Sequence, residues 1–222
     1  MAIVSIDSSS DSLYIALEVN DEIFCKSYPD LRRADKKLLD GILEIMDEHN
    51  VCLDDIEYFV ISEGPGSFTS LRIAASVAKG FTSSKGIRIK SVSSLLNLAL
   101  SYKNHDKDRV VIPLIDARMN RFYSAVFKDK ERLSDDEDIS FENILKKPYD
   151  KIAFVTHPDE RYKVLSRIDI SSVSYKKDIL FASKDQVQNP AFTMIEIAKN
   201  MDFDDYSKGP KYVREHSGLC RE

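Results

Sequence analysis

Gly64-Pro65-Gly66-Ser67-Phe68-Thr69-Ser70-Leu71-Arg72 decides the fold, because this stretch joins an apolar strand to a helix. The run before it, Tyr58–Ser62, is aromatic and β-branched, as in a buried strand. The run after it, Leu71–Phe81, repeats apolar residues at helical spacing. Gly64 and Gly66 permit a positive φ or the close approach of another backbone, and the proline between them stiffens the turn. The sequence therefore predicts a tight loop between a strand and a helix.

The start of this predicted helix is a candidate anion site. Ser67 or Thr69 can cap the helix, whose first amide groups point outward without partners. Arg72 lies about one turn further on, so the loop offers amide donors and a positive charge to a phosphate or carboxylate. The anion can belong to a ligand or to another protein. An ordinary turn followed by a capped helix is the alternative, and this stretch alone leaves both open.

A strand that ends in an aspartate occurs twice in the chain. Asp7 ends the first and Asp116 the second, and in each case a polar turn leads into a further strand, at Tyr14–Leu17 and Tyr123–Val126. The next turns also fall in step: Asn20-Asp21 and Asp129-Lys130. A period of about a hundred residues is too long for a solenoid unit and predicts two similar α/β lobes. The alternative is a coincidence between hairpins with acidic turns, which are common.

The composition is that of an ordinary soluble protein. The 222 residues, 43% of them hydrophobic, are enough for one large domain or two small lobes. Neither export nor a membrane span is indicated, because the apolar runs are of strand length. The scattered Cys25, Cys52 and Cys220 fit reduced thiols, so we expect a cytoplasmic protein. A net charge of −5 argues against a dedicated nucleic-acid surface.

The chain is predicted to divide into lobes at residues 1–104 and 105–222, joined by a polar segment. Besides the elements above, the first lobe is expected to contain a strand meander over 2–28, a helix over 31–49, a strand over 87–92 and a helix over 93–102. The second is expected to contain a strand over 151–155 and helices after Pro158 and Pro190. The tail over 208–214 is expected to pack back on the body.

The helix over 31–49 has an apolar stripe wider than one buried face needs, which leaves part of it for a partner. The helix after the glycine loop is rich in small residues, which permit close helix contact. The candidates for a partner surface, or for its support, are Leu38, Leu39, Ile42, Ala75 and Phe81. Burial in the core is the alternative for each of them. A charge at Ile42 is expected to abolish association without unfolding the protein, and unfolding would identify a core position.

Four segments together resemble the TsaB family: Asp7-Ser8-Ser9, the Gly64–Arg72 loop, Pro113–Arg118 and Pro210-x-Tyr212-x-Arg214. The resemblance spans nearly the whole chain. It implies a two-lobed α/β fold of the actin-like, Hsp70-like ATPase superfamily, with duplicated ribonuclease H-like βββαβα units and a degenerate second lobe. It also implies a non-catalytic accessory subunit of a TsaD-like paralogue in the formation of threonylcarbamoyladenosine in tRNA. Older descriptions of such relatives as M22-like glycoproteases follow from this kinship.

The same resemblance implies a vestigial or partner-completed anion or nucleotide site. Its candidate residues are Asp7, Ser8, Ser9, Gly64, Gly66, Ser67, Thr69, Arg72, Asp116 and Arg118. A working member of the fold needs flexible loops in both lobes to hold phosphates and adenosine. No glycine lies between Ile87 and Lys208, so we expect the isolated chain to bind no cofactor. ATP and the metal are then expected to act in the partner complex.

Metal and peptidase signatures are weak in this sequence. The four histidines lie far apart, without the one-turn spacing at which the catalytic paralogue holds its ion. No Ser-His-Asp order or Cys-His pair stands out, so no catalytic residue is predicted. Asp7 and Asp116 are candidates for paired carboxylates, but carboxylates that cap turns are far more frequent. Two departures from the family pattern are Asp35, in place of a histidine, and Ser70, in place of a glycine.

Three classes of function follow from these features. The favoured one is the accessory subunit, which acts with a TsaD-like paralogue and a TsaE-like ATPase and meets tRNA only through the complex. The helix over 31–49 and the helix after the glycine loop are also expected to pair two copies of the chain when the paralogue is absent. The second class is a stand-alone ATP-dependent kinase or a peptidase, and the third is a tRNA-binding module, which the acidic balance disfavours.

Overall fold

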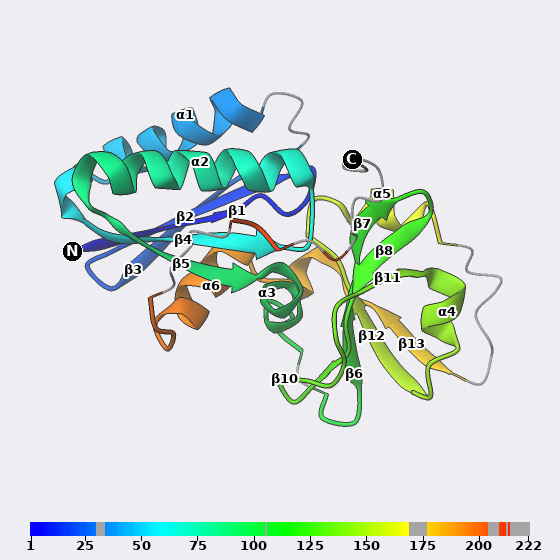
Figure 1. Cartoon of the computed structure of the whole chain (residues 1–222). Coiled ribbons are helices and arrows are strands. Elements are labelled where there is room, and N and C mark those ends of the chain that lie inside the picture. The colour runs from blue at the N-terminus through cyan, green and yellow to red at the C-terminus, as the bar shows by residue number, and fades with distance from the viewer. Residues whose placement is uncertain (30–33, 105, 169–176, 204–208, 212, 214–222) are drawn as a thin grey trace, which may run out of the picture.

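The structure, a computed structural model, describes residues 1–29, 34–104, 106–168, 177–203, 209–211 and 213. Two α/β lobes lie side by side (Figure 1). The first contains a five-stranded sheet with the order β3-β2-β1-β4-β5. The second contains a five-stranded sheet, β10-β9-β6-β12-β13, and a separate three-stranded sheet, β11-β8-β7. The two-lobed α/β architecture predicted from the repeat is therefore confirmed.

The first lobe follows the predicted order of elements. Its strands are β1 (Ala2–Asp7), β2 (Leu13–Val19), β3 (Glu22–Tyr28), β4 (Ile56–Gly64) and β5 (Arg88–Ser93). Its helices are α1 (Ala34–Glu48), a short 3-10 turn (Leu53–Asp55), α2 (Phe68–Lys85) and α3 (Ser94–Leu100). The first three strands form an antiparallel meander, and β4 and β5 run parallel to β1. Residues 31–33, where α1 was expected to begin, lie outside the described residues.

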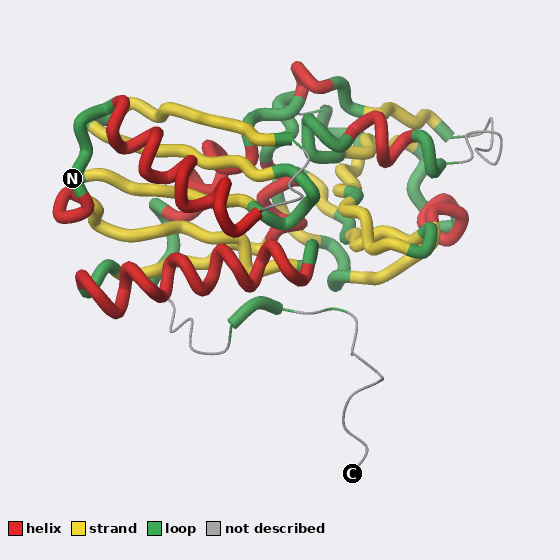
Figure 2. Tube along the Cα trace, turned by 90° about the horizontal axis from the view of Figure 1, so that it is seen from above, coloured by secondary structure: helices red, strands yellow, loops and turns green. Residues whose placement is uncertain are grey.

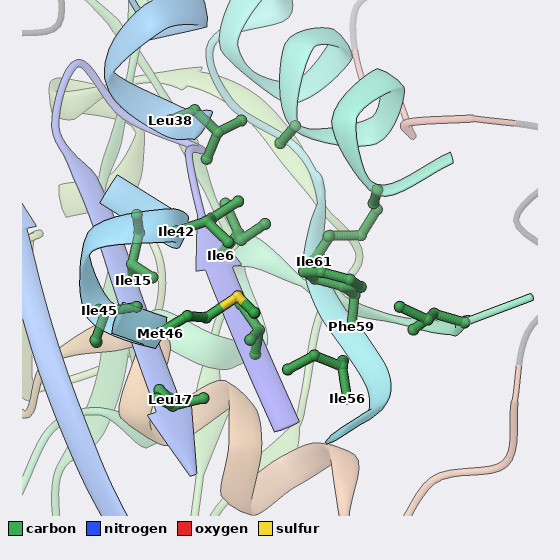
Figure 3. Close-up of a cluster of buried hydrophobic side chains, with 14 of the residues drawn as sticks. Ile6, Ile15, Leu17, Leu38, Ile42, Ile45, Met46, Ile56, Phe59 and Ile61 are labelled. Atoms are coloured by element: carbon green, nitrogen blue, oxygen red, sulfur yellow. The ribbon is translucent and has the colours of Figure 1, made fainter. Parts of the chain in front are cut away.

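Helices cover both faces of the first sheet (Figures 1 and 2). Helices α1 and α2 lie over one face, and α6 (Pro190–Ala198) lies over the other. Strand β2 is consequently buried on both faces over Leu13–Glu18, which explains its nearly unbroken apolar sequence. The inner face of α1 sends Leu38, Ile42, Ile45 and Met46 into a cluster with the strands (Figure 3).

The second lobe is built from shorter elements. Its strands are β6 (Val110–Pro113), β7 (Ile115–Arg118), β8 (Arg121–Ser124), β9 (Phe127–Lys128), β10 (Glu131–Arg132), β11 (Glu137–Ser140), β12 (Lys151–Val155) and β13 (Asp178–Phe181). Its helices are α4 (Phe141–Leu145), α5 (Arg161–Leu165) and a 3-10 turn (Lys184–Gln186). The strands expected as single runs over 113–116 and 123–126 are each interrupted. As a result the aspartate turn of this lobe lies in the small sheet.

The repeat is visible in the backbone of both lobes. Asn20 and Asp21 both have positive φ in the turn between β2 and β3. Asp129 and Lys130 both have positive φ in the turn between β9 and β10. Two-residue hairpins of this kind require positive φ at both central positions. The same turn at equivalent positions supports the duplication.

The end of the chain returns to the first lobe. Helix α6 follows the second lobe in sequence but packs against β1, β2, β4 and β5, so the division at residue 104 stays a prediction. The Lys211 amide donates to the Glu63 carbonyl oxygen at 2.6 Å. Gly64 has a φ of +105°, and a Cβ there would lie 2.5 Å from the Lys211 carbonyl oxygen. The tail therefore contacts the first lobe at Lys211, while Tyr212 and Arg214 lie outside the described residues.

Candidate functional site

A cavity of about 320 Å³ lies between the two lobes. The first lobe contributes the turn after β1 and the glycine loop before α2. The second lobe contributes β7 with its turn, the residue His157 after β12, and helix α5. The structure therefore brings together the two aspartate turns and the glycine loop that the sequence singled out.

Asp7 is fully buried behind Ser9 and His157, which line this cavity. Its Oδ1 accepts hydrogen bonds from the Ser9 amide at 2.9 Å and the Ser9 hydroxyl at 2.7 Å. Its Oδ2 accepts a hydrogen bond from the Asn97 side-chain amide of α3 at 3.0 Å. Asp7 thus caps its own turn, as expected for a carboxylate in this position, and ties the turn to the helix between the lobes.

His157 reaches the same carboxylate from the second lobe. Its Nε2 lies 3.1 Å from Ser9 Oγ and 3.4 Å from Asp7 Oδ2, and its ring stacks on Tyr14. Burial opposes the ionised form of Asp7, but the hydrogen bond and charge of His157 and the hydrogen bonds from Ser9 outweigh it. The pKa of Asp7 therefore lies below its ordinary value of 3.8.

The Asp7, Ser9 and His157 cluster does not have the geometry of a catalytic triad. In a triad the carboxylate holds one ring nitrogen and the hydroxyl uses the other. Here both contacts fall on Nε2, and the Ser9 hydroxyl donates to Asp7. The sequence analysis did not single out His157 as a site residue. Its place just after the strand predicted over 151–155 was the signal available.

The glycine loop packs directly on the first aspartate turn. The Ser67 amide donates to the Ser9 carbonyl oxygen at 2.8 Å. A Cβ on Gly66 would lie 2.2 Å from that same oxygen, so only glycine allows this approach. Ser67 occupies the cap position of α2, but its hydroxyl contacts Ser70 Oγ and not a helix amide, so the expected side-chain cap is not formed. The Ser67 amide, one donor of the predicted anion site, is therefore already hydrogen-bonded within the protein.

The remaining first-lobe residues of the predicted anion site lie in different environments. Ser8 is buried, and its hydroxyl donates to the Ser70 carbonyl oxygen of α2 at 3.2 Å. Thr69 is exposed at the cavity mouth. The Arg72 guanidinium stacks over the Phe68 ring, 3.8 Å from its centroid. An anion-binding role for Arg72 stays a prediction.

Asp116 caps the second turn in the same way as Asp7, by accepting the Arg118 amide at 2.8 Å. Its carboxylate also meets three cations. The Arg118 guanidinium lies 3.1 Å away, Arg167 lies 2.7 Å away and Lys163 lies 3.7 Å away. Asp7 and Asp116 do not form a carboxylate pair, because each is engaged by different groups of the protein.

Asp11 links the two lobes across the cavity. Its Oδ1 pairs with Arg118 Nη2 at 2.7 Å, and its Oδ2 pairs with Lys163 Nζ. Burial opposes the ionised form of Asp11, but the hydrogen bonds and charges of Lys163 and Arg118 hold its pKa below the ordinary value of 3.8. Glu160 of the same region accepts a hydrogen bond from the Ser12 hydroxyl at 2.7 Å. The sequence analysis missed Asp11, Glu160, Lys163 and Arg167.

The predicted partner residues fall on two sides of the helices. Leu38, Ile42 and Ala75 are buried in the first core, and Phe81 packs partly against it, so these positions can only support a surface. Leu39 is exposed, at 41%. The expectation that Ile42 tolerates a charge is corrected, because a buried carboxylate there would lack a partner and would unfold the chain. Exposed Leu43 was missed.

Metal ligands do not cluster in the part of the chain that the structure describes: no three His, Cys, Asp or Glu side chains there are grouped to hold an ion. The side chain of Asp35, one of the departures from the family pattern, lies outside the described residues. Ser70, the other departure, is buried and contacts Ser67 and Ser8. Among the described helices, none is both long enough and apolar enough to span a bilayer.

Comparison with solved structures defines the class of fold. YeaZ from Pseudomonas aeruginosa superposes with a TM-score of 0.75 at 19% identity, covering 96% of this chain and 99% of that one. AlfA from a B. subtilis plasmid, solved as a filament, superposes with a TM-score of 0.51 at 10% identity. This match covers 91% of this chain and 100% of AlfA. These superpositions show that the chain shares its two-lobed α/β fold with both proteins.

Sequence comparison identifies the family. The family model described as "TsaD: tRNA N6-adenosine threonylcarbamoyltransferase" matches residues 31–203, which is most of the chain. Identity is 34% over 125 residues to the tRNA threonylcarbamoyladenosine biosynthesis protein TsaB of Buchnera aphidicola subsp. Acyrthosiphon pisum (strain APS), covering 56% of this chain and 57% of that protein. The chain belongs to this family, and the curated proteins that it resembles in sequence are TsaB proteins.

A second relative gives a similar match. The TsaB protein of Bacillus subtilis (strain 168) is 29% identical over 134 residues, which cover 60% of this chain and 58% of that protein. The matched parts therefore span less than two thirds of each of these two relatives.

Proposed function

We propose that the chain is a non-catalytic accessory subunit that binds and activates a TsaD-like enzyme in the formation of threonylcarbamoyladenosine in tRNA. The names of its TsaB relatives support the pathway. The observation that carries the accessory role is the state of the interlobe cavity. Its charged groups are engaged with one another, and no three His, Cys, Asp or Glu side chains among the described residues are grouped to hold a metal.

The cluster around Asp7 supports the same conclusion. A general base must offer a free lone pair to the group that it deprotonates. His157 turns the same nitrogen toward Asp7 and Ser9, and the Ser9 proton is directed to the carboxylate. The arrangement stabilises a buried turn, and it does not activate the Ser9 hydroxyl. A peptidase role therefore has no support in this site.

The outer face of α1 is the surface that we assign to the partner. Leu39 and Leu43 are four residues apart, so they lie on one face of the helix, and both are exposed, at 41% and 46%. A shallow groove continues from this face. It is lined by Leu43, Glu44, Met46, Asp47, Val51, Cys52, Leu53 and Lys85. Exposed apolar side chains beside such a groove are typical of a protein interface.

The wider assembly follows from the same proposal. The TsaD-like paralogue supplies the metal and the chemistry, and a TsaE-like ATPase completes the complex. Transfer RNA meets this chain only through that complex, because the chain carries a net charge of −5. In the absence of the paralogue, the exposed face of α1 pairs two copies of this chain. A cytoplasmic location matches these partners.

Sedimentation velocity of the chain mixed with the TsaD-like enzyme of the same source tests the proposal. The double variant Leu39→Asp, Leu43→Asp should weaken the heterodimer by at least about tenfold, because charges would be buried without partners. Its unfolding midpoint should match the wild type, since both side chains are exposed. Leu133→Asp is the matched control, because Leu133 is a leucine of similar exposure, 51%, in the second lobe. Equal binding by the double variant and the wild type would contradict the proposed surface.

A further inference from the structure

Asp11 belongs to the first lobe, yet both of its cationic partners belong to the second. It lies in the turn between β1 and β2, while Arg118 follows Asp116 at the end of β7 and Lys163 lies on α5. We propose that Asp11 is a built-in anionic ligand, whose carboxylate fills a cation site formed by Arg118 and Lys163 and so holds the lobes together. In this role it replaces a small molecule bridging the lobes.

The cation site is formed by the second lobe itself. Arg118 adopts a positive φ of 65° and donates its own amide to Asp116, which fixes the start of its side chain. Its guanidinium contacts Asp116 through Nη1 and Asp11 through Nη2, at 3.1 and 2.7 Å. Lys163 also lies 3.7 Å from Asp116 and 3.7 Å from Glu160. The two cations are therefore held in place by groups of their own lobe, ready to receive a carboxylate.

Asp11 belongs to a linked network of three cations and three carboxylates beside the cavity. The cations are Arg118, Lys163 and Arg167, and the carboxylates are Asp11, Asp116 and Glu160. Without Asp11 this group has one more positive charge than negative charges. Arg118 and Lys163 would then face a cavity of about 320 Å³ whose lining includes the hydroxyl groups of Ser10, Ser67 and Thr69. A small oxyanion would fit there and would restore the balance.

Two of the other polar contacts between the lobes lie near the cavity and differ from the Asp11 contact in burial. His157 meets Asp7 and Ser9, and the Ser12 hydroxyl meets Glu160, through groups that are almost fully buried. Asp11 is instead 34% exposed at its side chain. A carboxylate at the mouth of the cavity can be replaced by a dissolved anion, whereas the buried contacts cannot.

Hydrogen exchange measured by mass spectrometry tests this proposal in Asp11→Ala. Peptides that cover residues 8–12 and 161–165 should exchange about tenfold faster than in the wild type, because an interlobe contact of two ion pairs is lost. Millimolar pyrophosphate should restore slow exchange in the variant and leave the wild type unchanged. Asp178→Ala is the matched control, since Asp178 pairs with Arg109 inside the second lobe at 2.6 Å. It should change neither peptide.

A second variant separates the built-in ligand from a merely structural aspartate. Arg118→Gln combined with Lys163→Gln should loosen the same peptides but show no response to pyrophosphate, because the cation site is gone. If Asp11→Ala fails to fold, Asp11→Asn keeps the shape of the side chain and should give the same faster exchange with the same rescue. Wild-type exchange rates in the Asp11 variants, or loosening that pyrophosphate does not reverse, would overturn the proposal.

Discussion

The two aspartate turns begin alike and end in different environments. Asp7 accepts the Ser9 amide at 2.9 Å, and Asp116 accepts the Arg118 amide at 2.8 Å. Asp7 is fully buried among neutral and imidazole groups, whereas Asp116 lies at the edge of the cavity among three cations. The local turn is therefore set by the sequence around each aspartate. The other contacts of the Asp7 and Asp116 carboxylates depend on the lobe that surrounds each of them.

The two aspartates differ in environment because the strands that precede them differ. In the first lobe Ser5 pairs with Ala16 inside an unbroken sheet, and the Ser5 hydroxyl donates to the Ala191 carbonyl oxygen of α6. Leu114 occupies the equivalent place in the second lobe and is buried in the second core. There the strand breaks between β6 and β7. The aspartate turn is thereby carried out of the main sheet and toward the cavity.

The largest effect is expected from removing the buried aspartate. Asp7→Ala should lower the free energy of unfolding by about 3–5 kcal/mol, because Asn97, Ser9 and His157 would lose their shared acceptor. Asp116→Ala should cost about 1 kcal/mol or less, since its partners reach solvent. Urea unfolding of both variants measures the contrast. Equal losses would show that the two turns are energetically equivalent.

Exchanging the residues at the strand break should have the next largest effect. Ser5→Leu should destabilise the chain by about 1–3 kcal/mol, because a larger side chain must fit between the sheet and α6. Leu114→Ser should cost about 2–5 kcal/mol by leaving a cavity and a buried hydroxyl. Denaturant unfolding measures both. If Ser5→Leu is neutral, side-chain size does not explain why the first sheet stays intact.

Acid should weaken the chain through carboxylates of the first lobe. The pKa values of Asp7 and Asp11 are lower in the folded protein than the ordinary 3.8, so their stabilising effect is complete above that pH. It is lost as the pH falls below 3.8 toward the folded pKa values, since the unfolded chain then binds more protons. In Asp11→Asn the loss of stability between about pH 4 and 2 should be shallower than in the wild type. Identical slopes would contradict the role of Asp11.

The smallest effect concerns the two equivalent hairpin turns. Lys130 has a φ of 70° and Asp21 a φ of 63°, and positive φ is less unfavourable for aspartate than for lysine. Lys130→Gly should stabilise the protein by about 0.5–1 kcal/mol, and Asp21→Gly by less. Thermal unfolding resolves the difference as a shift of a few degrees. A larger gain at Asp21 would argue against equivalent turns.

The fold was largely predictable because its signals are local. The glycine loop, the two aspartate turns and the helical stripe of α1 each lie within a short run of sequence. The cavity network was not predictable in this way, because Asp11 pairs with residues 107 and 152 positions away. The burial of Ile42 was missed for a related reason. A wide apolar stripe does not show which of its members face the sheet and which, like Leu39, face outward.

Titration calorimetry of the isolated chain with ATP and magnesium tests the central claim most directly. That claim is that the protein acts by docking, since the charged groups that line its cavity are already paired with one another. The account predicts no saturable heat of binding for the wild type. Saturable binding of ATP to the lone chain, abolished by Asp7→Asn or Asp116→Asn in a folded variant, would contradict it.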